Sequence, residues 1–204
     1  MTPADDALRA SLRGRRFEAV VIGGSAGGVD ALVALLPALP AGFTLSVFCI
    51  LHVPGNRDSR LAELFDERLP MPVKEAADKE EIAPGTVYFA GAGYHLSVER
   101  DRTFSLSCEP PVHFARPAID VLMESSADVY GPALAGILLT GANHDGADGM
   151  ARIRARGGFT VVQDPADAQV PTMPLSAIHR CEPSLILPLA RIHALLPMLE
   201  MNEP

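Results

Sequence analysis

The fold of this chain is decided by the stretch AVVIGGSAGGVDAL, residues 19–32. It opens with an apolar, β-branched run that ends at Ile22, passes through a glycine-rich segment, and continues into a helix-forming run. This succession predicts a strand, a tight turn and a helix at the start of a parallel sheet. The glycines allow backbone angles that a Cβ would forbid. The turn therefore presents Ser25 above the strand ends, where open α/β sheets bind ligands.

Two kinds of functional site fit a turn of this shape. Gly23-x-Ser25-x-Gly27 matches the nucleophile elbow G-x-S-x-G. A dinucleotide cradle, G-x-G-x-x-G, needs glycine at position 25 so that the backbone can approach a pyrophosphate, and serine is there instead. A purely structural turn with an incidental serine is an equally open interpretation of the motif by itself.

Composition narrows the class of protein. The 204 residues suffice for one α/β domain, and a hydrophobic share of 48% supports a full core without disulfides. Three cysteines without C-x-x-C spacing, and no signal peptide, favour a cytoplasmic location. No apolar run approaches the roughly 18 residues of a membrane helix, so we expect no membrane insertion. The net charge of −8 argues against nucleic-acid binding, and the basic cluster at residues 13–16 is interpreted as a solvated edge.

Hydrophobic periodicity predicts alternating strands and helices after an N-terminal arm, residues 1–16, that is loose or a short helix. The predicted strands are 17–23, 44–51, 133–139, 159–163 and 184–187, and the predicted helices are 29–36, 59–68, 117–130, 147–156, 175–178 and 190–199. Asp58 is the expected N-cap of the second helix, after a loop at 53–56. Short alternating segments at 86–90, 95–99 and 103–107 predict an antiparallel insert of hairpins. The fold class is therefore α/β, with residues 17–204 forming a doubly wound, mostly parallel sheet with helices on both faces and an antiparallel hairpin extension at one edge.

A chemically active side chain follows each of three predicted strands. The first strand ends at Ser25, the second at His52, and the strand from Ala133 ends at Asp145. If all three strands are parallel, a hydroxyl, an imidazole and a carboxylate line one crevice, which is the arrangement of nucleophilic acyl transfer. Taken singly, His52 could merely cap a strand and Asp145 could be a turn residue. His144 beside Asp145 suggests a metal ligand, but no second ligand pair has zinc spacing, so no metal is expected.

The chain resembles the catalytic domain of chemotaxis protein-glutamate methylesterases over residues 17–199. The motifs that carry the resemblance are IGGSAGG at 22–28, LHVP at 51–54, PGTVYFA at 84–90, His95, RPAIDVL at 116–122, LTGANHDGADGM at 139–150 and MPLSAI at 173–178.

The resemblance implies a serine hydrolase that removes methyl groups from glutamate side chains of chemoreceptors and often deamidates receptor glutamines. Ser25 would be the nucleophile, His52 the general base and Asp145 its orienting partner. The backbone N–H groups of Ala26 and Ala142 would donate hydrogen bonds to the oxyanion. No cofactor is implied. The expected partners are cytoplasmic helices of methylated chemoreceptors, or a related signalling protein.

Two arginines are candidate substrate contacts. Arg60 and Arg116 are expected to flank the crevice and meet an acidic receptor helix, although solvated surface arginines explain them equally well. The oligomeric state is left open.

Some features depart from the family pattern. Family members carry a receiver domain before this domain, whereas about 16 residues precede the first strand here, so control by phosphorylation within the chain is not expected. Gly24 and Ala26 replace alanine and threonine, and Ala142-Asn143 replaces a methionine-glycine pair. Two alternatives remain: a non-hydrolytic docking module on the same fold, and a nucleotide-binding domain.

Overall fold

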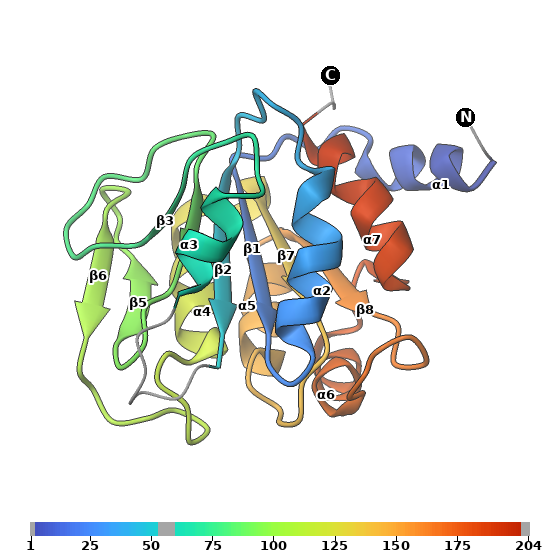
Figure 1. The fold of residues 1–204 in the computed structure, drawn as a ribbon. Coiled ribbons are helices and arrows are strands. Elements are labelled where there is room, and N and C mark those ends of the chain that lie inside the picture. The colour runs from blue at the N-terminus through green and yellow to red at the C-terminus, as the bar shows by residue number, and fades with distance from the viewer. Residues whose placement is uncertain (1–2, 53–59, 201–204) are drawn as a thin grey trace.

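A seven-stranded parallel sheet forms the centre of the molecule (Figure 1). The computed structural model describes residues 3–52 and 60–200. Within them the strand order is β3-β4-β2-β1-β7-β8-β9. The strands of this sheet are β1 (Ala19–Gly24), β2 (Ser46–Leu51), β3 (Val73–Glu75), β4 (Val87–Phe89), β7 (Leu134–Leu138), β8 (Phe159–Gln163) and β9 (Leu185–Leu187).

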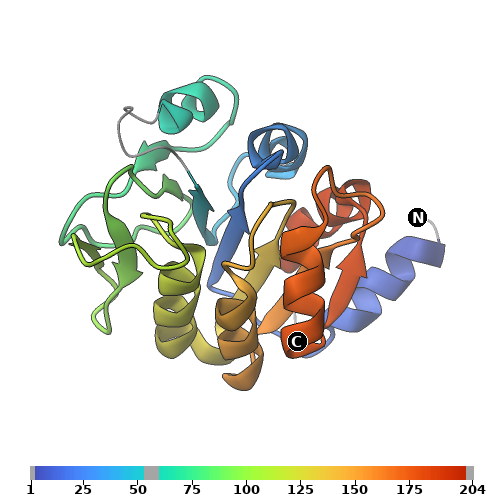
Figure 2. The ribbon, with the colours of Figure 1, turned by 90° about the horizontal axis from the view of Figure 1, so that it is seen from below.

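Helices cover both faces of the sheet, as Figure 2 shows. The α-helices are α1 (Pro3–Leu12), α2 (Gly28–Leu35), α3 (Leu61–Asp66), α4 (Ile119–Tyr130), α5 (Ala147–Ala155), α6 (Thr172–Cys181) and α7 (Leu189–Leu195), with 3-10 turns at Leu36–Ala38, Gly131–Ala133 and Leu196–Leu199. Helices α2 and α7 lie on one face, and α4 and α5 pack together on the other. The doubly wound fold class predicted from the sequence is confirmed.

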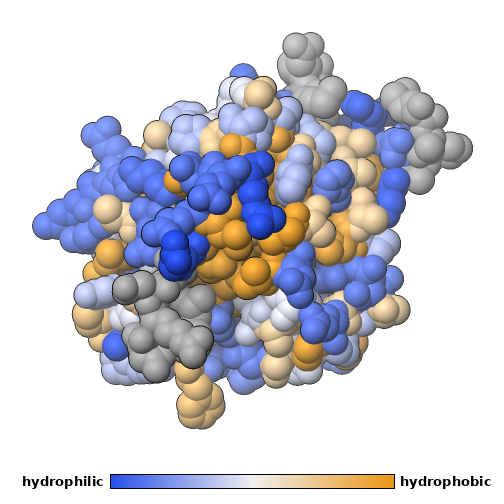
Figure 3. All heavy atoms as spheres, in the orientation of Figure 1, coloured by the Kyte–Doolittle hydropathy of each residue, from blue (hydrophilic) through white to orange (hydrophobic). Residues whose placement is uncertain are grey.

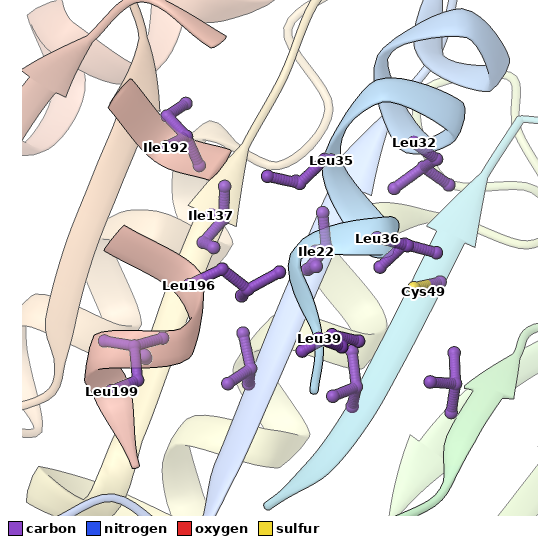
Figure 4. Packing of buried hydrophobic residues seen from close by; sticks show 14 of the residues in the cluster. Ile22, Leu32, Leu35, Leu36, Leu39, Cys49, Ile137, Ile192, Leu196 and Leu199 are labelled. Atoms are coloured by element: carbon purple, nitrogen blue, oxygen red, sulfur yellow. The ribbon is translucent and has the colours of Figure 1, made fainter. Parts of the chain in front are cut away.

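The sheet separates two hydrophobic cores. Every residue of β1 and β2 is buried, because each face of these strands packs against one of the cores. In β1, Val20 and Ile22 contribute to the core beneath α2 and α7, whereas Ala19 and Val21 contribute to the core beneath α4 and α5. Figure 4 shows the first core, where the leucines of α2 and of the last helical turns meet Ile22 and Ile137. Burial on both faces explains why these central strands are continuous apolar runs.

The antiparallel part is smaller than the sequence indicated. The segment 86–90, predicted within the antiparallel insert, contains β4, which pairs in parallel with both β2 and β3. Among the described residues, the antiparallel pair of strands consists of β5 (His95–Val98) and β6 (Phe104–Ser107). Alternation within a short strand shows which residues face the core but not which neighbour the strand joins.

The N-terminal segment is helical where it is described. Leu8 and Leu12 of α1 are buried in the core beneath α2 and α7. In the face drawn in Figure 3, hydrophobic residues gather at the surface between α3 and α2. Val33 of α2 and Leu61 and Leu64 of α3 are partly buried and pack against the core beneath α2 and α7. Among the described residues, no helix has both the length and the apolar character needed to cross a membrane. The predicted loop at 53–56 and the Asp58 cap lie outside the described residues.

The topology places the candidate site. The chain moves from β1 to β2 on one side, and later to β7 on the other side of β1. The strand order therefore reverses beside β1, and the carboxyl ends of β1, β2 and β7 are neighbours. Such a switch point is where doubly wound sheets form their ligand crevices.

Candidate functional site

Ser25 is fixed in the turn between β1 and α2. Its backbone N–H donates to the Thr140 carbonyl (2.9 Å), and its carbonyl accepts from the Gly28 N–H (2.7 Å). Gly27 has a φ of 79°, and a Cβ there would lie 2.3 Å from Oε1 of Gln169. The positive φ therefore favours glycine, and a Cβ at this position would also force the Gln169 side chain to move. The turn leaves the Ser25 side chain half-buried at the end of β1.

His52 is the first residue after β2 and connects two groups. Its Nδ1 lies 3.0 Å from Ser25 Oγ, and its Nε2 lies 2.7 Å from Asp145 Oδ2. An ionised Asp145 only accepts hydrogen bonds, so the neutral ring carries its proton on Nε2. The Nδ1 lone pair then faces the Ser25 hydroxyl and can accept its proton. The His52 side chain is 15% exposed, which leaves one edge open to a substrate.

Asp145 is fully buried and accepts three hydrogen bonds. Besides His52, its donors are the backbone N–H groups of Ile119 (2.8 Å) and Asp120 (2.9 Å) in the first turn of α4. Burial raises the pKa of this carboxyl, but the hydrogen bond from His52 and the two backbone N–H groups outweigh it and hold the pKa below its usual value. Asp145 is therefore ionised at neutral pH and positioned to orient the imidazole.

The two alanines predicted as oxyanion donors lie in the loops on either side of this triad. Within the part of the chain that the structure describes, the N–H groups of Ala26 and Ala142 donate no hydrogen bond, although the neighbouring Ser25 and Gly141 N–H groups do. Both alanines are exposed. The Ala26 carbonyl is held by Thr140 Oγ1 at 2.9 Å. Two backbone N–H groups in the loops that flank Ser25 thus have no acceptor among the described residues.

The two predicted substrate arginines differ in their surroundings. Arg60 precedes α3; its side chain is 82% exposed, and its Nε pairs with Glu63 Oε2 at 2.8 Å. Arg116 donates from one nitrogen to the carbonyls of Cys108 (2.9 Å) and Glu109 (3.0 Å). Arg116 therefore fixes its own loop, a role that sequence reasoning did not anticipate.

Sequence reasoning also missed the support of Asp145. Asp120 Oδ1 accepts from the Gly149 N–H at 2.7 Å, so α4 and α5 are joined directly behind the triad. The motif RPAIDVL drew attention to this segment, but nothing in its pattern indicates that two backbone N–H groups bind a carboxylate. Phe114 is fully exposed in the loop before α4.

Comparison with known proteins identifies the family of this chain. The family model described as CheB methylesterase matches residues 20–196. The chain belongs to the CheB methylesterase family. The crystal structure of the Thermotoga maritima CheB methylesterase catalytic domain superposes with a TM-score of 0.84 at 31% identity, covering 90% of this chain and 98% of that one.

Curated relatives point to the same family. One relative is a protein of Leptospira interrogans whose name provisionally assigns it as a protein-glutamate methylesterase/protein-glutamine glutaminase. It is 42% identical to this chain over 187 residues, which cover 92% of this chain and 97% of the Leptospira protein. A protein-glutamate methylesterase/protein-glutamine glutaminase of Anaeromyxobacter dehalogenans is 40% identical and covers 91% of this chain, which spans 54% of that longer protein.

Proposed function

We propose that this protein is a serine hydrolase that demethylates glutamate methyl esters on chemoreceptors and deamidates receptor glutamines. The observation that carries the proposal is the unbroken contact from Ser25 Oγ through both ring nitrogens of His52 to Asp145. A buried, ionised acid, a correctly protonated imidazole and a half-buried hydroxyl are the parts that acyl transfer requires. The names of the family and of the relatives supply the substrate class.

The reaction proceeds in two steps. His52 Nδ1 takes the proton of the Ser25 hydroxyl as Oγ attacks the glutamyl carbonyl. The same nitrogen returns that proton to the departing oxygen, so methanol leaves and an acyl-enzyme remains. Water then gives a proton to Nδ1 and attacks the acyl carbon. Nδ1 returns that proton to Ser25 Oγ as the acyl bond breaks, and the carboxylic acid that is released loses its own proton to the solvent and becomes a carboxylate. With a glutamine substrate the leaving group is ammonia.

The backbone N–H groups of Ala26 and Ala142 are the proposed oxyanion donors. Each such donor contributes about 3 kcal/mol to transition-state stabilisation in comparable sites. Because both belong to the main chain, side-chain replacement at 26 or 142 leaves the donors in place. The flanking loops, rather than particular side chains, thus determine how well the oxyanion is held.

Substrate contacts are proposed on the rim of the site. Arg60 is free to leave its exposed pair with Glu63, since such pairs contribute little. Phe114 offers an apolar surface in the loop before α4, and Arg116 holds that loop in place. The proposed partners are the methylated cytoplasmic helices of chemoreceptors, and the proposed location of the protein is accordingly the cytoplasm.

The decisive experiment measures methanol release from methylated receptor fragments. We expect Ser25→Ala to lower turnover by up to about a millionfold, because the variant lacks the hydroxyl that contacts His52 Nδ1. Ser105→Ala, in β6 and away from the triad, is the matched control and should retain full activity.

Labelling with a serine-directed fluorophosphonate separates the enzyme from a docking module on the same fold. An enzyme reacts at Ser25 and loses the label in Ser25→Ala, whereas a docking module need not react. Methanol release by Ser25→Ala at the wild-type rate would disprove the mechanism.

A further inference from the structure

Three potential metal ligands gather behind the triad. They are His113 from the loop before α4, Asp120 from the first turn of α4, and Asp148 from the first turn of α5. One ligand atom from each lies within 4.8 Å of the other two. His113 Nε2 and Asp120 Oδ2 are 3.1 Å apart. The cluster is separate from the catalytic groups, because Asp120 contacts Asp145 only through its backbone N–H.

Asp120 gives the second and stronger indication of a ligand. Its side chain is only 6% exposed. Its Oδ1 is occupied by the Gly149 N–H, but its Oδ2 is buried and has no hydrogen-bond partner among the described residues. The nearby His113 Nε2 lies at ion-pair distance without the alignment of a hydrogen bond. A buried carboxylate oxygen left in this state is costly and calls for a cation.

The spacing of the first two ligands fits zinc. Zinc binds histidine nitrogen and carboxylate oxygen at about 2.0–2.2 Å, so two ligands of a tetrahedral ion lie about 3.3 Å apart. The observed 3.1 Å between His113 Nε2 and Asp120 Oδ2 is close to that value. The His113 ring is also held from the side by the ring of His144, whose centroid is 4.3 Å away.

Asp148 can complete the site by a small side-chain movement. Its side chain is 48% exposed and pairs with Arg180, which is 61% exposed. Ion pairs this exposed contribute little to stability. Turning one carboxylate oxygen from Arg180 toward His113 therefore exchanges a weak contact for a metal bond, and the other oxygen can remain with the guanidinium.

We propose that His113, Asp120 and Asp148 bind one divalent transition-metal ion, with zinc as the best fit and a water molecule as fourth ligand. The ion joins the loop before α4 to the first turns of α4 and α5. Those two helices support Asp145, so the ion acts as a clamp on the position of the carboxylate rather than as a participant in ester cleavage. The proposal does not depend on the esterase activity.

The test uses the full chain without a polyhistidine tag, freed of metal with a chelator. We expect calorimetric titration with zinc chloride to show one site, and zinc to raise the Tm relative to the chelated protein. Cobalt(II) in place of zinc should give the visible absorption of a tetrahedral nitrogen- and oxygen-ligated ion. Each of these readouts is independent of catalysis.

Matched variants locate the site. His113→Ala should weaken zinc binding by at least about tenfold, and His193→Ala, which removes an exposed histidine on α7, should leave the affinity unchanged. Asp148→Asn alters only an exposed side chain, so it should fold normally and also weaken binding. The proposal is overturned if the wild-type chain binds no zinc, or if it binds zinc as tightly after His113→Ala or Asp148→Asn.

Discussion

At the scale of single residues, the candidate site depends on two aspartates that differ in charge state. Asp145 accepts three hydrogen bonds and is held ionised. Asp120 supplies one of those bonds through its backbone N–H, yet its own Oδ2 has no hydrogen-bond partner among the described residues. Burial raises the pKa of Asp120 to about 7, and the nearby Asp145 charge adds to this effect, against the Gly149 N–H and His113. The same backbone turn thus keeps one carboxyl charged and the other close to neutrality.

This difference predicts a pH dependence of stability. Between the ordinary value of 3.8 and about 7, the folded protein binds more protons at Asp120 than the unfolded chain does. The contribution of Asp120 is therefore fully present below pH 3.8 and is lost as pH rises towards 7, by at most about 1.4 kcal/mol per pH unit. Urea unfolding of metal-free protein from pH 4.5 to 8 measures this slope.

Asp120→Asn is the comparison for that slope, because an amide cannot titrate but can still accept from Gly149 and donate to His113. We expect the variant to lose less stability than the wild type as pH rises from 4.5 to 7, and the two slopes to coincide above pH 8. Asp128→Asn, on the exposed side of α4, should keep the wild-type slope. Equal slopes for wild type and Asp120→Asn would refute the assignment.

At the scale of elements, the contact between α4 and α5 depends on the absence of a side chain. A Cβ at Gly149 would lie 2.5 Å from Cβ of Met123 and 3.2 Å from Oδ1 of Asp120. Alanine at 149 would improve helix propensity by about 1 kcal/mol, but the clash involves a Cβ that cannot rotate away. We expect Gly149→Ala to lower the free energy of unfolding by about 1–3 kcal/mol.

Helix propensity and packing predict opposite effects of Gly149→Ala on the free energy of unfolding. Propensity alone predicts stabilisation, so a loss must come from separating the two helices that support Asp145. Ala155→Gly, at the exposed end of α5, calibrates the propensity effect in the same helix. For Gly149→Ala, the free energy of unfolding measured in urea and the rate of methanol release should both fall. An increase in the free energy of unfolding would show that the helices separate without cost.

The element scale also shows what the sequence could and could not predict. The sequence could predict that Ser25, His52 and Asp145 lie close together, because each follows a buried strand and the carboxyl ends of parallel strands lie at one edge of the sheet. The support of Asp145 could not, because backbone N–H groups leave no mark in a sequence. Likewise His113, Asp120 and Asp148 come from a loop and two helices whose crossing is set by packing, and no spacing rule brings them together.

At the scale of the whole molecule, the net charge of −8 opposes an acidic partner, while Arg60, as a proposed substrate contact, would attract one locally. Like charges repel over about 10 Å at 0.1 M salt, and the repulsion fades as salt rises. The overall field and the local arginine therefore predict opposite preferences. Substrate peptides that differ only in the charge beside the methyl ester can distinguish them.

We expect the overall field to dominate encounter, because a single exposed charge such as Arg60 contributes little beside a net charge of −8. A glutamyl methyl ester peptide flanked by lysines should then show a higher kcat/KM than the same peptide flanked by glutamates at low salt, with the two values converging at high salt. Arg60→Ala should change neither value by more than about twofold, as expected for an exposed pair. A preference for the glutamate-flanked peptide that disappears in Arg60→Ala would instead make the local charge decisive, and would mean that the acidic surface lies away from the path of the substrate.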